Sequence, residues 1–497
     1  MKRHNKWLWF PWILSTLTVA VNCQSIPDFP EYAQRITLTD HDEQLISYDL
    51  DQNRSPDYYQ RYDRLGRIVE LRFPSPDNSP QTVLLDEIPN SEVPHFIIAL
   101  DGIPFEIIDQ LYQQGHFRLF HPPTKVISCF PSMTDLAFQQ IFHSAQPLAY
   151  QARHFDREAN RLIPGNQIYL EGQNADWINL VDYRCATWLD AVSYVNPGFV
   201  FQHELGAMHE LFLRPDADTR IAYTVATAGF ATQQGRSGIL ECLRTMDRFC
   251  QQIVFEHKGR VKITLLADHG HNLHGCRRIR FDQFLKESRF QLADQLQNPG
   301  DVVMVDYGLV TFVAVFTDQT APLAQVLLQH PAVDLICYPQ NQTIIVQNIT
   351  GKAVIRRRDR RYSYTVESGD PLGLLPVIER LRPTHQIDQD GFIDDRAWFC
   401  ATVDHIYPDP LRRLHQAFHG LVREPADLIV CLKDGFCHVS GAFDVFIDAA
   451  STHGSLNQSN SATFLMTMPG PTPQPLRLEE IMPTLEQLHS GSRKSPH

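Results

Sequence analysis

Two apolar runs that each end in an aspartate constrain the fold of this 497-residue chain more than any other feature. Residues 96–100 read Phe-Ile-Ile-Ala-Leu and lead into Asp101-Gly102, while the apolar stretch 261–267 leads into Asp268-His269-Gly270. A run without polar alternation is typical of a strand buried on both faces of a parallel sheet. Chemistry in such sheets collects at the carboxyl ends of the strands, where Asp101 and Asp268 fall.

The rest of the chain alternates strand-like and helix-like patterns. Strand-like runs occur at 301–305, 311–316, 343–347 and 426–430, and helical patterns follow Thr134 and occupy 238–250, 321–330, 372–381 and 408–420. This alternation predicts an α/β fold with a doubly wound, mostly parallel sheet. We expect it to span residues 93–486, with an insertion rich in Trp, Tyr and His at about 150–220.

The beginning of the chain has the pattern of an export signal. Basic residues precede an apolar run at 7–21, which is short for a membrane span but suits a secretory signal over residues 1–23. Cys23 stands where a bacterial lipoprotein carries its acylated cysteine, and plain signal-peptidase cleavage nearby is an equal alternative. We expect an exported protein, periplasmic or on the cell surface, whose only membrane contact would be a lipid on Cys23.

Two further segments flank the α/β unit. Short β-type runs divided by polar turns at 24–92 predict a β-rich N-terminal region. Residues 487–497 read as a disordered tail.

Charge argues against a nucleic-acid partner. The formal net charge is -13, whereas binding to nucleic acid needs a basic surface. Five arginines do gather within 356–361, but an alternating pattern follows them, which favours a solvated strand or hairpin edge.

The ten cysteines contain no C-x-x-C pair and do not indicate a structural zinc cluster. A bridge between Cys431 and Cys437 across a turn and buried free thiols both remain open.

Four short polar segments carry the candidate chemistry. They are Leu100-Asp101-Gly102, residues 130–137 around Thr134, Ala267-Asp268-His269-Gly270 and Ser451-Thr452-His453-Gly454. Carboxylate oxygen and imidazole nitrogen suit zinc or manganese, and a hydroxyl held near such a metal can attack phosphorus. Each segment alone is more often a cap or a turn.

Taken together, the segments resemble the alkaline phosphatase superfamily, and within it the type I phosphodiesterase/nucleotide pyrophosphatase branch. The resemblance covers about 94–486. Its motifs are Phe-Pro-Ser-x-Thr ending at Thr134, Ala-Asp-His-Gly ending at Gly270, Tyr-Pro-Asp-Pro-Leu ending at Leu411, and Thr-His-Gly ending at Gly454, followed by Thr-Phe-Leu-Met ending at Met466.

The resemblance implies a site and a mechanism. Asp101, Asp268, His269 and the Thr134 hydroxyl would bind one divalent metal, zinc or alternatively manganese. Thr134 would be the nucleophile and would pass through a phosphothreonine intermediate. His453 would belong to a second metal, and the insertion at about 150–220 would cap the site. The substrate would be a small-molecule phosphate ester.

The sequence departs from the family pattern at the second metal. The family places an Asp and a His four residues apart here, and residues 227–235 keep the frame but carry Ala228 and Thr232 instead. Alanine has no donor atom and a neutral threonine is a poor ligand. His271 and His274 could substitute, although an interpretation as surface or supporting histidines is favoured because they lie on another segment.

Two functions follow as hypotheses. The first is a metal-dependent hydrolase of phosphate mono- or diesters with one tight metal site and a degraded second site. The second is a catalytically impaired protein that binds a phosphorylated or sulfated ligand. A sulfatase is disfavoured, because Cys129-Phe130-Pro131-Ser132 is followed by Met133 where that signature needs an arginine.

Overall fold

The protein is described here from a computed structural model. The structure describes residues 37–40, 43–49, 53–75, 80–165, 176–215, 218–305, 308–384, 386–438 and 448–490. The signal-like segment with Cys23 lies outside these residues, as does 491–497. Among the helices that are described, none has the length and apolar character needed to cross a membrane.

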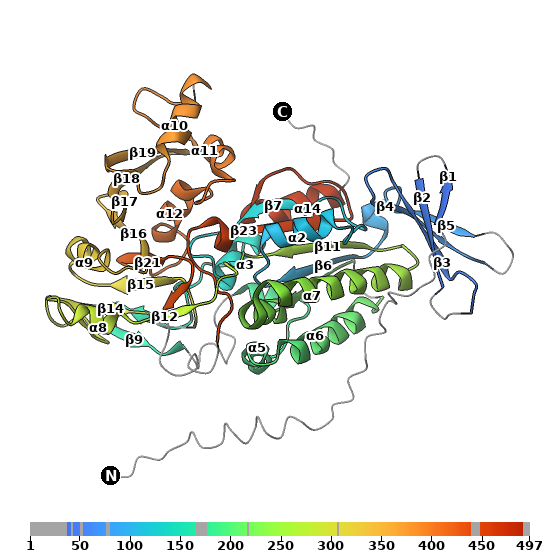
Figure 1. Ribbon diagram of the computed structural model, residues 1–497, viewed down its shortest axis with the longest axis horizontal. Helices are drawn as coiled ribbons and strands as arrows, with labels where there is room; N and C mark the ends of the chain where they lie inside the picture. Colours follow the sequence, from blue (N-terminus) through green and yellow to red (C-terminus); the bar gives the residue numbers. More distant parts are fainter. Residues whose placement is uncertain are drawn as a thin grey trace, which may run out of the picture.

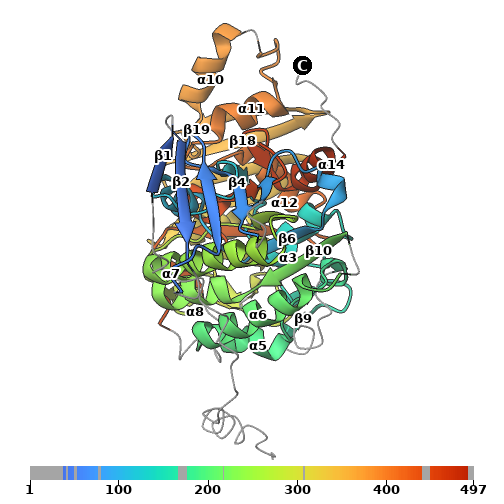
Figure 2. The ribbon, with the colours of Figure 1, turned by 90° about the vertical axis from the view of Figure 1, so that its right-hand side faces the viewer.

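Three main sheets follow one another along the long axis of the molecule (Figure 1). The first confirms the β-rich N-terminal region. It is a five-stranded antiparallel meander of β1 (Thr37–Asp40), β2 (Glu43–Tyr48), β3 (Tyr58–Tyr62), β4 (Ile68–Phe73) and β5 (Gln81–Leu84). Figure 2 shows this sheet in front of the rest of the molecule. Its Tyr58 and Phe73 rings pack against Phe255 near the end of a long helix, with ring centres 5.1 and 6.0 Å away.

The central sheet contains the two apolar runs that end in an aspartate, at 96–100 and 261–267. Its order is β10 (Thr219–Thr224), β6 (His95–Leu100), β11 (Lys262–Ala267), β23 (Ala462–Thr467), β7 (Thr124–Ile127) and β24 (Leu476–Arg477). β6 pairs in parallel with both β10 and β11, whereas β23 runs antiparallel to its two neighbours. All six residues of β6 and of β11 are buried, as the patterns predict.

Helices cover this central sheet. They are α2 (Phe105–Gln113), α3 (Thr134–Phe142), α5 (Thr187–Ser193), α6 (Pro197–Phe212), α7 (Ala226–Glu256), α13 (Gln458–Ser461) and α14 (Ile481–His489). In the view of Figure 1, α6 and α7 lie together below the sheet and α14 lies above it. α14 continues to His489, beyond the start expected for the tail.

The nine strands between residues 291 and 432 form a separate sheet, whereas the sequence pattern placed them in the parallel one. The order is β13 (Gln291–Leu292), β14 (Asp301–Met304), β15 (Phe312–Phe316), β21 (Leu428–Leu432), β16 (Val333–Gln340), β17 (Thr343–Asn348), β18 (Gly351–Arg358), β19 (Arg361–Ser368) and β20 (Ile393–Asp394). Apart from the β13–β14 pair its neighbours run antiparallel. Turns of a few residues join β16, β17, β18 and β19 in succession, and such turns cannot return a chain in parallel. The fold class is α/β, with parallel pairing concentrated in the central sheet.

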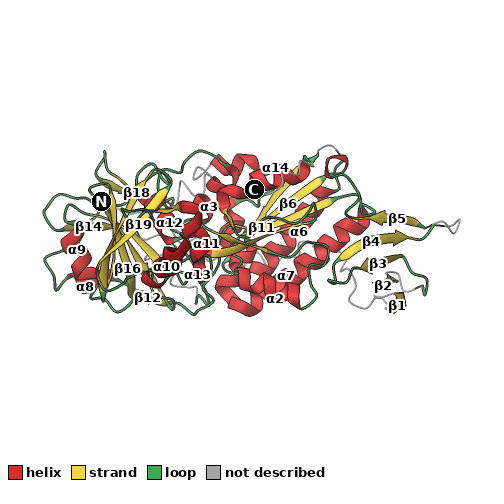
Figure 3. Ribbon diagram, turned by 90° about the horizontal axis from the view of Figure 1, so that it is seen from above, coloured by secondary structure: helices red, strands yellow, loops and turns green. Residues whose placement is uncertain are grey.

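Both faces of the nine-stranded sheet are covered, which explains its continuous apolar runs. Along β15, Phe312 and Ala314 belong to the large core shared with the central sheet, whereas Val313 and Val315 belong to a second core. Successive side chains of a strand point to opposite faces, so the two cores lie on opposite sides of the sheet. Figure 3 shows this sheet at the opposite end of the molecule from β1–β5.

The remaining elements are shorter. They are β8 (His154–Asp156), β9 (Arg161–Ile163), β12 (Arg277–Ile279), β22 (Phe436–His438), α8 (Phe281–Leu285), α9 (Thr320–Leu327), α10 (Leu375–Leu381), α11 (Asp395–Thr402) and α12 (Pro410–Phe418), with 3-10 turns at Asn90–Glu92, Asp176–Leu180, Arg382–Thr384 and Leu478–Glu480. The arginine-rich run forms the hairpin of β18 and β19, as expected.

One disulfide joins Cys437 to Cys276 rather than to Cys431, with Cα atoms 5.8 Å apart. Cys431 lies within β21 and its side chain is part of the large core. Cys437 lies beyond the following turn on β22, which pairs with β12 next to Cys276. The pairing of β12 with β22 therefore determines that Cys437 is bonded to Cys276.

Peptide mapping of unreduced protein should recover Cys276 linked to Cys437, with Cys431 as a free thiol. The bridge spans 161 residues, so Cys437→Ser should lower the free energy of unfolding by about 2–5 kcal/mol in chemical denaturation. Cys400→Ser, at an exposed free cysteine, is the matched control and should leave stability unchanged. A peptide linking Cys431 to Cys437 would contradict the pairing.

Candidate metal centre

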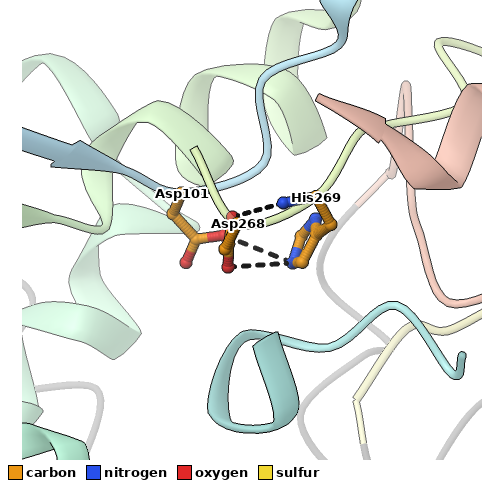
Figure 4. Close-up of side chains that lie close together, drawn as sticks. All are labelled: Asp101, Asp268 and His269. Atoms are coloured by element: carbon orange, nitrogen blue, oxygen red, sulfur yellow. Dashed lines mark hydrogen bonds and ion pairs between the residues drawn. The ribbon is translucent and has the colours of Figure 1, made fainter. Parts of the chain in front are cut away.

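Adjacent parallel strands bring the two aspartates together. Leu100 at the end of β6 is in register with Ala267 at the end of β11, so Asp101 and Asp268 leave the sheet side by side. His269 follows directly, and Figure 4 shows the three side chains converging. Its Nε2 atom lies 3.3 Å from Asp268 Oδ2 and 3.7 Å from Asp101 Oδ1. One ligand atom from each residue lies within 4.8 Å of the others, so the group could hold a metal ion.

In each of the two carboxylates, one oxygen accepts a hydrogen bond from the described part of the protein and the other accepts none. Asp101 Oδ2 accepts a hydrogen bond of 2.5 Å from the Tyr223 hydroxyl. Asp268 Oδ1 accepts from the backbone N–H groups of Gly102 and His269, at 2.9 and 2.8 Å. Asp101 Oδ1 and Asp268 Oδ2 are buried and have no hydrogen-bond partner in the described part of the chain. Buried carboxylate oxygens need a partner, and a cation between them satisfies both.

The imidazole of His269 is held in the tautomer that a metal requires. Its Nδ1 lies 3.0 Å from the carbonyl oxygen of Gly270, which can only accept, so Nδ1 carries the proton. The lone pair on Nε2 therefore faces the two carboxylates, as in metal-ligating histidines whose second nitrogen donates to a carbonyl group. The residues present fit a divalent metal.

The hydroxyl of Thr134 faces the same point. Thr134 is the first residue of α3, and its Oγ1 lies 3.4 Å from His269 Nε2. The turn before it is tied to the last polar segment: Ser132 N–H donates to the Gly454 carbonyl at 3.2 Å, and His453 Nδ1 donates to the Ser132 carbonyl at 2.9 Å. The four segments singled out from the sequence therefore meet in space.

The alternative nucleophile of a sulfatase is not supported by its surroundings. The side chain of Cys129 is buried, and burial raises the pKa of its thiol to about 12. Its Sγ atom lies 3.3 Å from the carbonyl oxygen of Pro131 rather than beside the two aspartates.

Arg413 holds the turn of residues 129–132, which precedes Thr134. This buried side chain donates to the Cys129 carbonyl at 3.1 Å, to the Leu456 carbonyl at 2.9 Å and to the Ser461 hydroxyl at 2.5 Å. It also reaches the hydroxyl of Ser132 at 3.4 Å. The guanidinium group of Arg413 thus joins α12, the turn before Thr134 and the segment after His453.

The start of α7 lies beside Asp101, although it carries Ala228 and Thr232 where the family resemblance implies two metal ligands. The Thr227 hydroxyl donates to the Asp101 carbonyl at 2.7 Å, which fixes the start of α7 beside the metal group. Gly235 has φ of 58°, in the left-handed region that favours glycine, and kinks the helix there. Ala228 and Thr232 are buried between these two points. Neither belongs to the metal-binding group, and a second metal of the family type does not fit them.

His453 lies next to the metal group without joining it. Its ring stacks on that of His269, with centres 4.1 Å apart and planes at 17°. The loop that carries it is held by the nine-stranded sheet, because Thr311 N–H donates to the His453 carbonyl at 2.9 Å. The site therefore lies at the junction of the two large sheets.

The aromatic residues of the insertion have mixed roles. Trp177 is buried and donates to Asp135 Oδ1 at 3.0 Å, beside Thr134, and its ring lies 5.2 Å from that of Tyr223. Trp188 is exposed, and His209 pairs with Glu256 at 2.8 Å on the far part of α7. Tyr183 and Tyr194 are half-buried, and His203 is exposed.

Burial dominates the electrostatics of the metal group. It raises the pKa of Asp101 well above the ordinary value, and the charge of Asp268 acts in the same direction. It also raises the pKa of Asp268 to about 6, against the opposing effect of the Gly102 N–H group. For imidazole the effect of burial has the opposite sign, and it lowers the pKa of His269 to about 4. At mildly acidic pH the metal-free site thus holds protonated carboxyl groups and neutral imidazole.

Sequence reasoning missed Tyr223 and Arg413. Tyr223 lies on β10, next to the strand that leads to Asp101, but β10 also carries Thr219, Arg220 and Thr224, so no local pattern singled out this tyrosine. Arg413 follows the motif that ends at Leu411, but no local pattern shows that its side chain is buried.

Zinc uptake should release protons at mildly acidic pH, with the carboxyl groups as their source. At about pH 5.5, Asp268 with its pKa of about 6 is largely protonated, whereas His269 with its pKa of about 4 is not. Affinity should therefore fall as the pH drops through about 6, with about one to two protons released per zinc. Calorimetry in buffers of different ionisation enthalpy measures this release. An affinity unchanged over that range would contradict the assignment.

Tyr223→Phe should weaken zinc binding by about 10–100-fold, because it removes the hydrogen bond that orients Asp101 while keeping the ring. Competition with a chelating dye measures the affinity. Tyr183→Phe is the matched control: its hydroxyl is buried without a hydrogen-bond partner among the described residues, so its removal should leave affinity unchanged. Equal effects of the two variants would show that Tyr223 acts through packing alone.

Comparison with known proteins gives structural likenesses only. No family model matches the chain, and no curated protein does. Murine ectonucleotide pyrophosphatase/phosphodiesterase 5 is 11% identical, with 81% of this chain and 96% of that chain covered and a TM-score of 0.41. The human protein of that name is 10% identical, with the same coverage and a TM-score of 0.43. Phosphonoacetate hydrolase from Sinorhizobium meliloti 1021, in complex with phosphonoacetate, is 11% identical, with 83% and 98% covered and a TM-score of 0.40. Two of these three proteins bear the name of the branch that the sequence motifs resemble.

Proposed function

We propose that this protein is an exported, metal-dependent hydrolase of phosphate mono- or diesters that uses Thr134 as its nucleophile. The observation that carries the proposal is the convergence of two unpaired, buried carboxylate oxygens with His269 Nε2 and the Thr134 hydroxyl. Such oxygens are costly in a site with no cation and are normal ligands in a site with one. Zinc is the first choice of metal, because one ligand is imidazole, and manganese the second.

The chain supplies the groups that a phosphoryl transfer requires. A divalent cation here would stabilise the Thr134 alkoxide and polarise a phosphoryl oxygen. Thr134 begins α3, and the N–H groups of a helix start favour a bound phosphate. Tyr223 and Gly102 orient the two carboxylates, and Arg413 holds the turn that carries the nucleophile. Attack of the Thr134 oxygen on phosphorus would break the P–O bond to the ester alcohol, which leaves, and would give a phosphothreonine. Water would then break the bond between phosphorus and the Thr134 oxygen, releasing the phosphate and restoring the hydroxyl.

Export is supported by the disulfide between Cys276 and Cys437, because such bridges persist in oxidising compartments. It agrees with the signal-like start of the sequence. Attachment through a lipid on Cys23 remains a prediction from the sequence.

The residues of α7 favour a second candidate. Ala228 and Thr232 leave the second metal of the family without two ligands, and a two-metal clamp normally stabilises both the attacking and the leaving oxygen. A protein that binds a phosphate or sulfate ester without turning it over is therefore the alternative.

Zinc-loaded protein should hydrolyse p-nitrophenyl phosphate or bis-p-nitrophenyl phosphate. Thr134→Ala should lower the rate on the order of a thousandfold or more, because it removes the nucleophile. Thr134→Ser should keep part of the activity, since it retains a hydroxyl at the same place. Initial rates with added zinc or manganese are the measurement.

Cys129→Ala is the matched control and should leave the rate within a few-fold, which also excludes a sulfatase-type nucleophile. Wild-type rates no higher than those of Thr134→Ala on both esters would reject the hydrolase for these substrates. Zinc-dependent binding of orthophosphate without turnover would then favour the second candidate.

A further inference from the structure

His271 is a buried group that the proposed mechanism leaves unused. Its side chain is 1% exposed, and its Nε2 atom has no hydrogen-bond partner in the ranges that the structure describes. Its other ring nitrogen, Nδ1, lies 3.0 Å from the Ser451 hydroxyl. Of the two interpretations of His271, as a surface or a supporting histidine, burial excludes the surface one, whereas His274 on the same loop is exposed. A buried ring nitrogen without a partner needs an explanation.

The backbone fixes His271 beside His453. Asn272 N–H donates to the Thr452 carbonyl at 2.9 Å, and Thr452 N–H donates back to Asn272 Oδ1 at 3.1 Å. Gly102 makes room on the other side: a Cβ atom there would lie 2.8 Å from His271 Nε2 and 2.5 Å from its Cδ2. The three neighbouring segments thus leave this imidazole in one position.

The separation of the His271 and His453 rings allows both to bind one ion. Their centres lie 5.0 Å apart with planes at 54°. Two imidazoles on one tetrahedral zinc ion have centres about 5 Å apart, because each nitrogen lies about 2.1 Å from the metal. His453 Nδ1 donates to the Ser132 carbonyl, so its Nε2 has a lone pair to offer. The stacked pair of His453 and His269, at 4.1 Å and 17°, is too close and too parallel to share an ion in this way.

The pair of His271 and His453 matters because α7 offers no ligand at Ala228 and only a poor one at Thr232. Ala450 N–H donates to the Thr232 carbonyl at 2.7 Å, so the start of α7 packs against the segment that leads to Ser451 and His453. Ala228 and Thr232 occupy the positions at which the family resemblance implies the co-ligands of His453. His271 supplies an imidazole from the Asp268 loop instead.

We propose that His271 and His453 form a second, weaker cation site, which takes zinc or manganese and is completed by water and by an oxygen of the phosphate ester. Imidazole selects these ions over magnesium. Two protein ligands are fewer than zinc usually has, so affinity is lower than at the Asp101–Asp268–His269 group, and a bound phosphate raises it. The role of the ester rests on the proposed function, whereas the binding of the cation alone does not.

Titration of metal-free, full-length protein with Co²⁺ tests this site, followed by visible spectroscopy and calorimetry. Wild-type protein should bind one tight and one weaker equivalent, and orthophosphate should tighten the weaker one about tenfold or more. His271→Ala should abolish the weaker equivalent and keep the tight one. His274→Ala, on the same loop but exposed, is the matched control and should keep both. His271→Gln, with circular dichroism, repeats the test with a side chain that still fills the space.

A single equivalent in wild-type protein, with or without orthophosphate, would overturn the proposal. So would a weaker equivalent that survives in both His271 variants. Two equivalents without hydrolysis of either ester would reject the proposed hydrolase and leave this site standing. One bound equivalent together with rapid hydrolysis would reject the second cation site and leave the proposed hydrolase standing.

Discussion

The parallel pairing of β6 with β11 is the interaction on which the rest of the site depends. It sets Leu100 opposite Ala267 and so delivers two carboxylates to one point at the buried end of the sheet. Two such groups side by side repel each other and lose their hydration, which is why burial and mutual charge raise the pKa of Asp101. A divalent cation bound between the two carboxylates offsets both their repulsion and their lost hydration.

The surrounding structure holds this point from several directions. Tyr223 from β10 orients one carboxylate, backbone N–H groups orient the other, and Arg413 from α12 holds the turn before Thr134. The loop of His453 is secured to the nine-stranded sheet through Thr311. Because these tethers come from two sheets, the site depends on the packing between them and not on any one element.

Much of the site could be predicted from local patterns. Asp101, Asp268 and His269 follow apolar runs directly, and a strand end is a local property of the sequence. The second sheet was harder, since its strands are covered on both faces and look like those of a parallel sheet. Only the short turns between β16, β17, β18 and β19 distinguish the two cases. The partner of Cys437 was likewise not local, because it lies 161 residues away.

The sequence by itself determined the types of the candidate ligands, the strand ends that carry them and the α/β class, and it placed Ala228 and Thr232 where the family resemblance implies two metal ligands. Only the tertiary structure decided which side chains lie within reach of one another. Burial and hydrogen bonding depend on contacts between distant segments, so a lone histidine after His269 gave no sign of its surroundings. That Asp101 and Asp268 each keep one unpaired oxygen, and that the Nε2 of His271 is unpaired beside His453, are facts of packing alone.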